Sequence, residues 1–378
     1  MRILQVYGPY DPPVYGGIQR ILNILRDGVP RFGHELVTLC ASHDRVTRVD
    51  HGPRGTVVHA ASFGKVLRHR LSPSLPFWIR KLRPDVLHFH YPSLSGVASC
   101  LITRPARPVV VSYHCDVQRR GWHRVFDAPV QAFLRRADRI LVSTPQTLDA
   151  SHALRPHRDR CEVLPYGLDL ERLRETDRTR EVTRALRESC AGPITLFVGR
   201  FHHYKGLDVL LEALPNVPGT LVLVGRGEEY AAVRSRVREG GLSARVRFAE
   251  EVPDEDLGGY YRAADLFVLP STSRAESFGL AMAEAMACGL PAVSTRLGTG
   301  TSFVNQDGVT GLEVEAGDAG ALAEAMRKLL EDPEEARRMG EAARGHAAGF
   351  SLDRMVEETV RMYETMGRRN PSGSTRGS

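Results

Sequence analysis

Residues 194–214 read ITLFVGRFHHYKGLDVLLEAL, and this stretch decides the fold class. A near-continuous apolar run is followed by a polar loop and then by an amphipathic helical pattern. Apolar runs of this kind are typical of parallel strands buried on both faces, because helices cover both sides of such a sheet. The stretch therefore predicts one strand–loop–helix unit of an α/β protein.

The same unit recurs along the whole chain. Strand patterns in the first half occupy residues 2–8, 35–41, 56–61, 85–91, 108–114 and 139–145. Strand patterns in the second half occupy residues 194–200, 220–227, 246–252, 266–271, 291–296 and 311–315. Helical patterns lie between them, and this alternation predicts doubly wound parallel sheets.

A polar segment at about 170–192 interrupts the alternation. A chain of 378 residues is also too long for one ordinary hydrophobic core. We therefore expect two tandem Rossmann-like domains, 1–180 and 190–350, with an interdomain cleft where ligands of open α/β sheets bind. A helix at 351–367 is expected to pack back toward the N-terminal domain, and 368–378 to be a disordered tail.

Charge and cysteine content indicate which kinds of ligand and compartment suit the protein. The net charge of +6 comes almost wholly from arginine and suits an anionic ligand. No basic stripe is interleaved with aromatic residues, so a nucleic-acid partner is not expected. The six cysteines are scattered, and the N-terminus reads directly as a strand rather than as a signal peptide. These features indicate a cytoplasmic protein.

Two cations mark the loop within residues 194–214. Arg200 stands at the end of the strand, and Lys205, one of only four lysines, comes just before a helix expected to open at Gly206. The helix dipole, free backbone N–H groups and both side-chain charges would favour an anion such as a diphosphate. The alternative is a pair of unrelated surface cations.

Gly16 and Gly17 follow the first strand and a proline-containing turn. Residues without a side chain let the backbone approach a ligand closely at the start of a helix. Alternatively, the two glycines only give the chain a flexible entry into that helix.

Residues 266–289, LFVLPSTSRAESFGLAMAEAMACG, read as strand, loop and helix. Glu276 precedes the helix, and Glu284 lies eight positions further on, inside it. Carboxylates accept hydrogen bonds from sugar hydroxyls, and backbone N–H groups at a helix start bind phosphate. One extended sugar nucleotide is therefore expected to contact both glutamates together with Ser277, Phe278, Gly279 and Leu280. The alternative is a charge in the first helical turn plus an exposed glutamate.

Together these elements resemble the retaining glycosyltransferases of family four, which have the two-domain GT-B architecture. The resemblance covers about residues 1–365 and rests on the E-x7-E motif, on FVGR and KGLDVLLEA, and on LVGRG. It implies that Arg200 and Lys205 bind the donor diphosphate. It also implies that Glu284 binds the ribose hydroxyls and that Glu276 lies against the transferred sugar.

The resemblance implies contacts from both domains. His114, at the end of a strand pattern, would approach the donor sugar, although a histidine in such a place is often structural. Gly16 and Gly17 would close over the phosphates from the N-terminal, acceptor-binding domain. The nucleotide base would stack near Phe248 in the C-terminal, donor-binding domain.

Neither a metal nor a cofactor besides the donor, a GDP- or UDP-linked sugar, is expected. The acidic run 254–256 reads as the first turn of a helix rather than as a metal site, and two cations already neutralise the diphosphate. The loop in 295–318 lacks the acidic residue that commonly follows the glycines in this family. This variant resembles bacterial mannosyltransferases of surface-polysaccharide pathways, so GDP-mannose is a candidate donor.

The expected reaction moves a hexosyl unit to an acceptor hydroxyl with retention, by a front-face mechanism. The acceptor would be a glycan, a lipid-linked sugar or a small metabolite. The alternatives are a sugar-nucleotide epimerase or hydrolase of the same fold, or a non-catalytic nucleotide-binding protein. A dehydrogenase is not expected, because no strand is followed by G-x-G-x-x-G.

Residues 64–84 mix basic with large apolar side chains. A segment of this composition can lie on an anionic membrane, which would place the protein peripherally at the inner face of the membrane. The alternative is a helix packed on the N-terminal domain with its arginines exposed to solvent.

Overall fold

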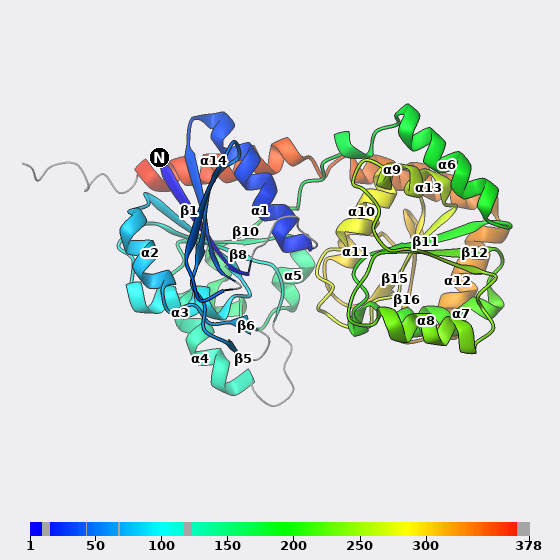
Figure 1. The fold of residues 1–378 in the computed structure, drawn as a ribbon, viewed down its shortest axis with the longest axis horizontal. Helices are drawn as coiled ribbons and strands as arrows, with labels where there is room; N and C mark the ends of the chain where they lie inside the picture. Colours follow the sequence, from blue (N-terminus) through cyan, green and yellow to red (C-terminus); the bar gives the residue numbers. More distant parts are fainter. Residues whose placement is uncertain (10–15, 43, 67–68, 117–122, 369–378) are drawn as a thin grey trace, which may run out of the picture. The chain divides into compact units, whose positions relative to one another are not determined.

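The computed structural model describes residues 1–9, 16–42, 44–66, 69–116 and 123–368. The chain forms two compact units (Figure 1): unit 1 comprises Met1–Gly167 and Leu352–Ser378, and unit 2 comprises Leu168–Ser351. The chain enters unit 2 at Leu168, before the predicted boundary at residue 180. Of the predicted tail, residues 369–378 lie outside the described residues.

Unit 1 is built on an eight-stranded sheet in the order β10-β9-β8-β7-β1-β2-β4-β3. All neighbours in it are parallel except β3, which pairs antiparallel with β4. The strands are β1 Arg2–Pro9, β2 Glu35–Ala41, β3 Arg48–Gly52, β4 Gly55–Ala60, β7 Val86–Tyr91, β8 Val109–Tyr113, β9 Arg139–Val142 and β10 Cys161–Val163. A separate two-stranded ribbon joins β5 Lys65–Val66 to β6 His69–Arg70. The sequence did not predict β3, whose five residues are all exposed at the sheet edge.

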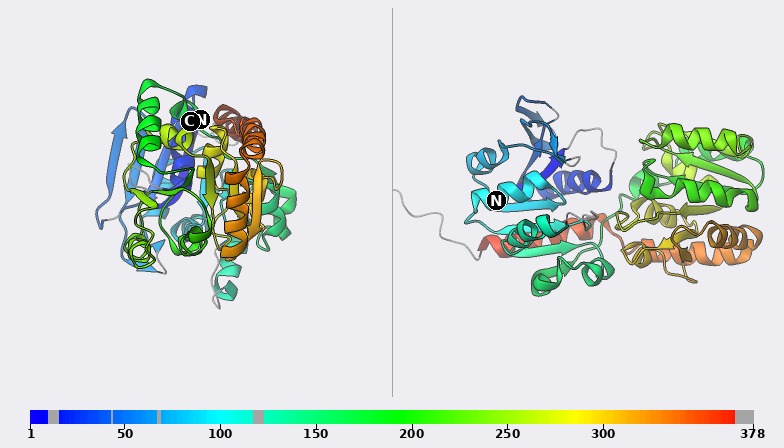
Figure 2. Two further views of the ribbon diagram at one scale, coloured as in Figure 1. Left: turned by 90° about the vertical axis from the view of Figure 1, so that its right-hand side faces the viewer. Right: turned by 90° about the horizontal axis from the view of Figure 1, so that it is seen from below.

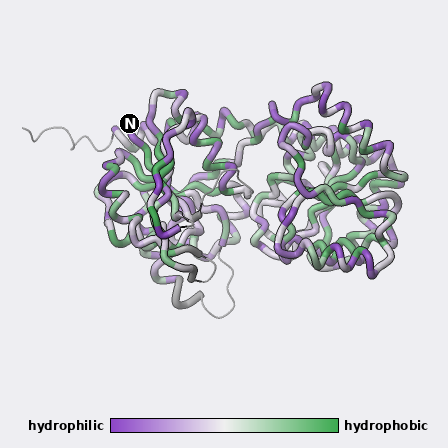
Figure 3. The backbone as a smooth tube through the Cα atoms, viewed as in Figure 1, coloured by the Kyte–Doolittle hydropathy of each residue, from purple (hydrophilic) through white to green (hydrophobic). Residues whose placement is uncertain are grey.

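Helices cover the sheet of unit 1, as the views in Figure 2 show. They are α1 Gly17–Gly28, α2 Leu75–Leu82, α3 Leu94–Thr103, α4 His123–Leu134, α5 Pro145–Ala150 and α14 Leu352–Arg368. The last of these returns from the end of the chain and packs on α1 so closely that a Cβ at Gly28 would lie 2.6 Å from Val356. The hydrophobic strands lie inside, and the helices carry most of the polar surface (Figure 3).

Unit 2 is built on a six-stranded, all-parallel sheet in the order β13-β12-β11-β14-β15-β16. The strands are β11 Ile194–Val198, β12 Thr220–Val224, β13 Val246–Ala249, β14 Leu266–Leu269, β15 Ala292–Arg296 and β16 Gly311–Glu315. These are the six strands that the apolar runs predict, so the doubly wound α/β class is confirmed. The chain order diverges on either side of the β11/β14 pair, which makes that pair the topological switch point.

The helices of unit 2 are α6 Asp177–Ser189, α7 Leu207–Ala213, α8 Tyr230–Glu239, α9 Leu257–Ala263, α10 Leu280–Ala287, α11 Thr301–Val304, α12 Ala319–Glu331 and α13 Pro333–Ala347. Two single 3-10 turns, η3 Glu171–Leu173 and η4 His203–Lys205, contribute residues to the site described below. Helix α6 occupies the polar segment that the sequence presents as a gap between domains.

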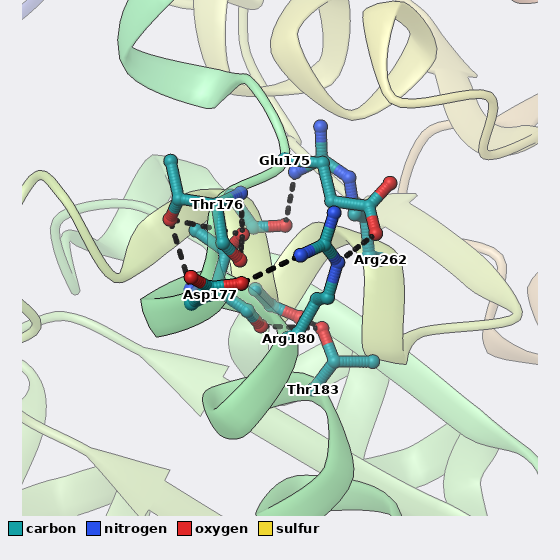
Figure 4. Close-up of polar contacts among 9 residues, drawn as sticks. Glu175, Thr176, Asp177, Arg180, Thr183 and Arg262 are labelled. Carbon is teal, nitrogen blue, oxygen red and sulfur yellow. Dashed lines mark hydrogen bonds and ion pairs between the residues drawn. The ribbon is translucent and has the colours of Figure 1, made fainter.

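Local polar contacts stabilise the start of helix α6 (Figure 4). Thr176 and Thr179 form a reciprocal capping box at its start, and Arg180 pairs with Glu175 at 2.8 Å. A Cβ at Gly259 of α9 would lie 2.8 Å from the carbonyl oxygen of Thr179, so only a residue without a side chain lets the helices meet so closely. The polar composition reflects an exposed helix, not a linker.

Helix α2 lies within residues 64–84, the segment for which membrane contact is predicted. Its Phe77 is 60% exposed, and the Lys81 ammonium lies 4.4 Å from the centre of the Trp78 ring. Residues 67–68 of the segment lie outside the described residues. No helix in the described part of the chain is long and apolar enough to span a bilayer.

Candidate active site

The loops that follow β11 and β14 meet at the switch point of unit 2. Gly206, at the end of the first loop, has φ +66°. A Cβ there would lie 2.0 Å from the carbonyl oxygen of Pro270 in the second loop. Glycine is therefore required both by the backbone angle and by the contact, and it brings the two loops together.

A buried ion pair joins these loops. The Nζ of Lys205 lies 2.5 Å from Oε2 of Glu276, and the two side chains are 11% and 10% exposed. Ser271 donates a second hydrogen bond to the same oxygen at 3.0 Å, and Thr299 donates to the backbone carbonyl of Glu276 at 2.8 Å. The carboxylate is thus held by Lys205 from the loop after β11 and by Ser271 from the loop after β14, while Thr299 from a third loop holds the backbone of Glu276.

The charge of Lys205 is retained despite burial. Burial by itself lowers the pKa of this ammonium, but the Glu276 carboxylate raises it, and the net pKa is raised. Arg200 is exposed, and its repulsion is among the influences on Lys205, so the two cations lie in the same electrostatic neighbourhood. The structure therefore places Lys205 against Glu276 and Arg200 within electrostatic reach of Lys205, and their contact with a donor diphosphate remains a prediction.

Helix α10 begins at Leu280, four residues after Glu276. Its N-cap is Gly279, at φ +80° and with no side-chain cap, so first-turn N–H groups such as that of Leu280 have no acceptor within the helix. Ser277 is half-buried, and the ring of Phe278 packs edge-on against Phe350, with centroids 5.5 Å apart. By contrast, α7 starts at Leu207 and has only seven residues, so the expected anion site gains little from its start.

Glu284 is buried inside α10 and carries partners that the sequence did not predict. Arg172 of η3 donates a very short hydrogen bond to its Oε1, and the Tyr261 hydroxyl donates to Oε2 at 3.0 Å. Burial lowers the pKa of Arg172, but Glu284 outweighs that effect and the net pKa is raised. The alternative of an exposed glutamate is therefore wrong, and Arg172 and Tyr261 are candidate site residues without a local sequence signal.

Two carboxylates of the acidic run before α9 pair with arginines. Asp256 stands at the N-cap of the helix and accepts two hydrogen bonds from Arg178, at 2.6 and 2.8 Å. Asp254 lies 3.4 Å from Arg172. The exposed Asp254 thus shares the guanidinium that also holds Glu284.

Phe248 lies in β13, at the outer edge of the sheet and two strands away from β11. Its ring meets Tyr230 edge-on, with centroids 5.7 Å apart, and the Arg234 guanidinium lies 5.8 Å from its centre. Base stacking near this residue remains a prediction.

His114 lies in unit 1 at the end of β8, fully buried in a chain of aromatic side chains. Its Nδ1 is hydrogen-bonded to the Tyr166 hydroxyl at 2.5 Å, and its Nε2 to Nδ1 of His90 at 3.0 Å. His90 in turn stacks on His88, with ring centroids 4.3 Å apart. Burial lowers the pKa of His114 to about 3, so the ring is neutral. Contact with a donor sugar would require one of its hydrogen bonds to break, and that role remains a prediction.

Gly16 and Gly17 lie at the start of α1 in unit 1, where Gly16 is the N-cap in an extended conformation and Gly17 is exposed. The turn before them, residues 10–15, lies outside the described residues. Their predicted contact with the donor phosphates therefore remains untested.

Comparison with known families gives two matches. The model described as "Glycosyl transferases group 1" matches residues 180–346, and the model described as "Glycosyltransferase Family 4" matches residues 15–172. The O-antigen chain mannosyltransferase C of Escherichia coli is 32% identical over 97% of this chain and 99% of its own length. The D-rhamnosyltransferase WbpZ of Pseudomonas aeruginosa is 32% identical over 91% of this chain and 90% of its own length.

Solved structures share the fold. Sucrose-phosphate synthase from Thermosynechococcus elongatus superposes with a TM-score of 0.83 at 24% identity, covering 97% of this chain and 99% of the other. Anabaena HepE in complex with UDP-glucose superposes with a TM-score of 0.76 at 18% identity, covering 97% of this chain and all of the other. These likenesses confirm the GT-B type of fold with two parallel-sheet units.

Proposed function

Because this chain belongs to glycosyltransferase family 4, we propose that it transfers a hexosyl unit from a nucleoside-diphosphate sugar to an acceptor hydroxyl, with retention and without a metal ion. Membership in that family also favours transfer over the epimerase, hydrolase and binding-protein alternatives. Mannose is the candidate sugar, because a relative that matches nearly the whole chain is named a mannosyltransferase. A GDP- or UDP-linked donor is supported by the structural likeness to HepE with UDP-glucose.

The observation that carries the proposal is the Lys205–Glu276 pair at the β11/β14 switch point. A buried ammonium that keeps its charge, an exposed guanidinium at Arg200 and the open N-terminus of α10 offer an anion three kinds of positive partner. A diphosphate carries at least two negative charges and can use all three. With the diphosphate neutralised by the chain itself, the reaction needs no metal at this site.

The same contacts define how the residues would act. As the bond to the sugar lengthens, negative charge grows on the leaving diphosphate, and Arg200 and Lys205 stabilise that charge. The Glu276 carboxylate accepts hydrogen bonds from Lys205 and Ser271, so it is positioned to hold the sugar rather than to act as a free nucleophile. The leaving phosphate oxygen would then take the acceptor proton on the same face, which yields retention.

Glu284 would hold the ribose of the donor. Its Oε1 is bound by Arg172 and its Oε2 by Tyr261, and each oxygen of a carboxylate can accept more than one hydrogen bond. Arg172 therefore orients the carboxylate, so that the ribose hydroxyls can donate to it. We regard Arg172 and Tyr261 as positioning residues.

The acceptor is proposed to be a glycan or lipid-linked sugar, as the relative's O-antigen name indicates, with a small metabolite as the alternative. A cytoplasmic enzyme that meets a lipid-linked acceptor would contact the inner face of the membrane peripherally. The exposed Phe77 and Lys81 on α2 are compatible with such contact.

The test is a panel of GDP- and UDP-linked hexoses incubated with the protein and candidate acceptors in the presence of EDTA. We expect one donor to be consumed only when an acceptor hydroxyl is present, and NMR of the product to show the donor's anomeric configuration. Equal consumption without any acceptor would establish a hydrolase instead. An inverted product would refute the front-face mechanism.

A further inference from the structure

Unit 1 contains a concave site that is formed by none of the residues of the candidate active site. It is a groove of about 930 Å³, within the range of small-molecule sites. Its lining comes from residues 105–108 before β8, from 135–139 before and at the start of β9, and from α14. Because these segments lead into their strands, the groove lies at the amino ends of β8 and β9. His114 lies at the opposite, carboxyl end of β8.

The groove has an excess of positive charge. Its lining includes the arginines Arg107, Arg135, Arg136, Arg139 and Arg361. Its acidic side chains are Asp138, Glu162 and Glu358.

Two of these three carboxylates are already engaged. The backbone N–H of Val109 donates to Asp138 at 2.8 Å, and Glu358 pairs with Arg354 at 2.8 Å. In the described part of the chain, by contrast, no hydrogen bond or ion pair is made by the side chains of Arg107, Arg135, Arg136 and Arg361. The guanidinium groups are therefore available to a ligand. Two of the three carboxylates, by contrast, already accept hydrogen bonds from groups of the protein.

Apart from Thr365, the remaining lining is apolar. Pro105 and Pro108 come from the segment before β8, and Met362 and Met366 from α14. Both methionines are 8% exposed, so they form part of the floor of the groove rather than its rim. Methionine side chains adapt to ligands of varied shape, and an apolar floor beneath a charged rim suits an amphipathic molecule.

From this geometry we infer that the groove is a binding site for the phosphate group of a phosphate ester. The planar guanidinium groups of Arg135 and Arg136 would hold the phosphate through paired hydrogen bonds, and the methionines would contact the carbon chain. The shared chemistry is a phosphate monoester or diester, supplied either by a soluble sugar or glycerol phosphate or by a lipid headgroup. The proposal does not depend on the reaction proposed above.

A competing explanation is purely structural. Helix α4 ends at Leu134, and basic residues just beyond a helix end stabilise the negative end of its dipole. On that account Arg135 and Arg136 would support the helix and bind nothing. The two explanations differ in whether a phosphate ester binds in the groove and slows backbone hydrogen exchange there.

The experiment follows backbone hydrogen exchange in the full-length protein on addition of glycerol 3-phosphate, of phosphatidylglycerol vesicles, or of phosphatidylcholine vesicles. We expect one of the first two ligands to protect residues 105–109 and 135–139. Protection by glycerol 3-phosphate identifies a soluble ester as sufficient, whereas protection by phosphatidylglycerol vesicles alone identifies the lipid headgroup. Phosphatidylcholine should protect less, because its headgroup carries no net negative charge.

The variant Arg135→Ala/Arg136→Ala should weaken that binding about tenfold or more, as expected for two lost charge-assisted contacts. The matched control, Arg45→Ala/Arg48→Ala, removes two exposed arginines between β2 and β4 and should bind as the unaltered chain does. Hydrogen exchange over the core strands of unit 1 checks that both variants are folded. Absence of protection in the unaltered protein, or equal binding by the groove variant, would overturn the proposal.

Discussion

Unit 1 and unit 2 both bury titratable side chains in or beside their parallel strands. Those of unit 1 are neutral, whereas those of unit 2 are charged. Unit 1 buries His88, His90 and His114, and burial lowers the pKa of each, so that all three are neutral. Unit 2 buries Lys205 and Glu276 as an ion pair. His90 is hydrogen-bonded to His114, and His88 and His114 to nearby hydroxyl groups, whereas Nε2 of His90 has no hydrogen-bond partner among the described residues. The ion pair places two buried charges at the β11/β14 switch point.

The difference shows which unit is built to stabilise charge. A neutral hydrogen-bonded chain specifies how β7 and β8 pack, because each ring nitrogen needs a particular partner. A buried ion pair stabilises the fold less than apolar packing would, since desolvation offsets most of the attraction. Its presence at the switch point of unit 2 is better explained by ligand binding than by stability.

The largest expected effect is on unit 1 at acid pH. The folded-state pKa values of His88 and His114 are about 3, against 6.5 for the unperturbed group. Well above pH 6.5 these histidines are neutral in the folded and in the unfolded chain. As the pH falls from 6.5 toward 3, the histidines of the unfolded chain take up protons that those of the folded chain exclude, so the free energy of unfolding decreases. At about pH 5 the loss is on the order of 2 kcal/mol for each of these two histidines.

Backbone hydrogen exchange, corrected for intrinsic rates, separates the two units. Unit 1 should lose opening free energy between about pH 7.5 and pH 5, whereas unit 2 should change little. In unit 2, the hydrogen bonds from Arg178 lower the pKa of Asp256. The stability that this ionised carboxylate contributes is therefore lost only at more acidic pH. Equal losses in both units would contradict the assignment of a neutral histidine chain to unit 1.

The next effect concerns the charged pair in unit 2. Lys205→Ala should lower kcat/KM by roughly 10²-fold or more, because one donor that stabilises the leaving diphosphate is lost. Lys328→Ala, in the exposed part of α12, is the matched control and should be close to the unaltered enzyme. Turnover that survives Lys205→Ala undiminished would remove this residue from the mechanism.

A smaller effect is expected at the second buried carboxylate. Arg172→Ala leaves Glu284 without its counter-ion and should weaken nucleoside-diphosphate binding by about tenfold. Pyrophosphate, which has no ribose, should bind as before. Arg174→Ala is the control, because Arg174 is exposed and forms an ion pair with Glu171, three positions before it. An equal loss of pyrophosphate binding would indicate a general disturbance of unit 2.

The smallest effect is expected at Asp254, which also pairs with Arg172. This carboxylate is 78% exposed, and exposed ion pairs contribute little. Asp254→Asn should therefore change nucleoside-diphosphate affinity less than about twofold. A loss as large as that of Arg172→Ala would show that the orientation of Arg172 depends on both carboxylates.

Local sequence patterns revealed most of the fold. The twelve apolar runs became strands because a parallel strand buried on both faces leaves a continuous signal. Strand β3 escaped notice because its residues are exposed, and α6 because its polar surface resembles a linker. The E-x7-E spacing and the scarce Lys205 marked the switch-point loops.

The partners of the site residues had no comparable signal. Arg172 lies 112 positions from Glu284, and contacts at such a distance in sequence leave no periodic pattern. His88 and His90 were visible in principle: they are two positions apart in the otherwise apolar run VLHFHY, which places them on one face of a strand. That alternation was a cue to the buried histidine chain.

The central claim is that Arg200 and Lys205 hold the diphosphate of the donor without a metal. Isothermal titration of GDP and UDP in the presence of EDTA, into the unaltered protein and into Arg200→Ala/Lys205→Ala, tests it most directly. The claim predicts that one of the two nucleotides binds the unaltered chain at a single site and that the double variant loses at least about 10²-fold in affinity. Unchanged affinity in the double variant, or binding only after Mg²⁺ is added, would contradict it.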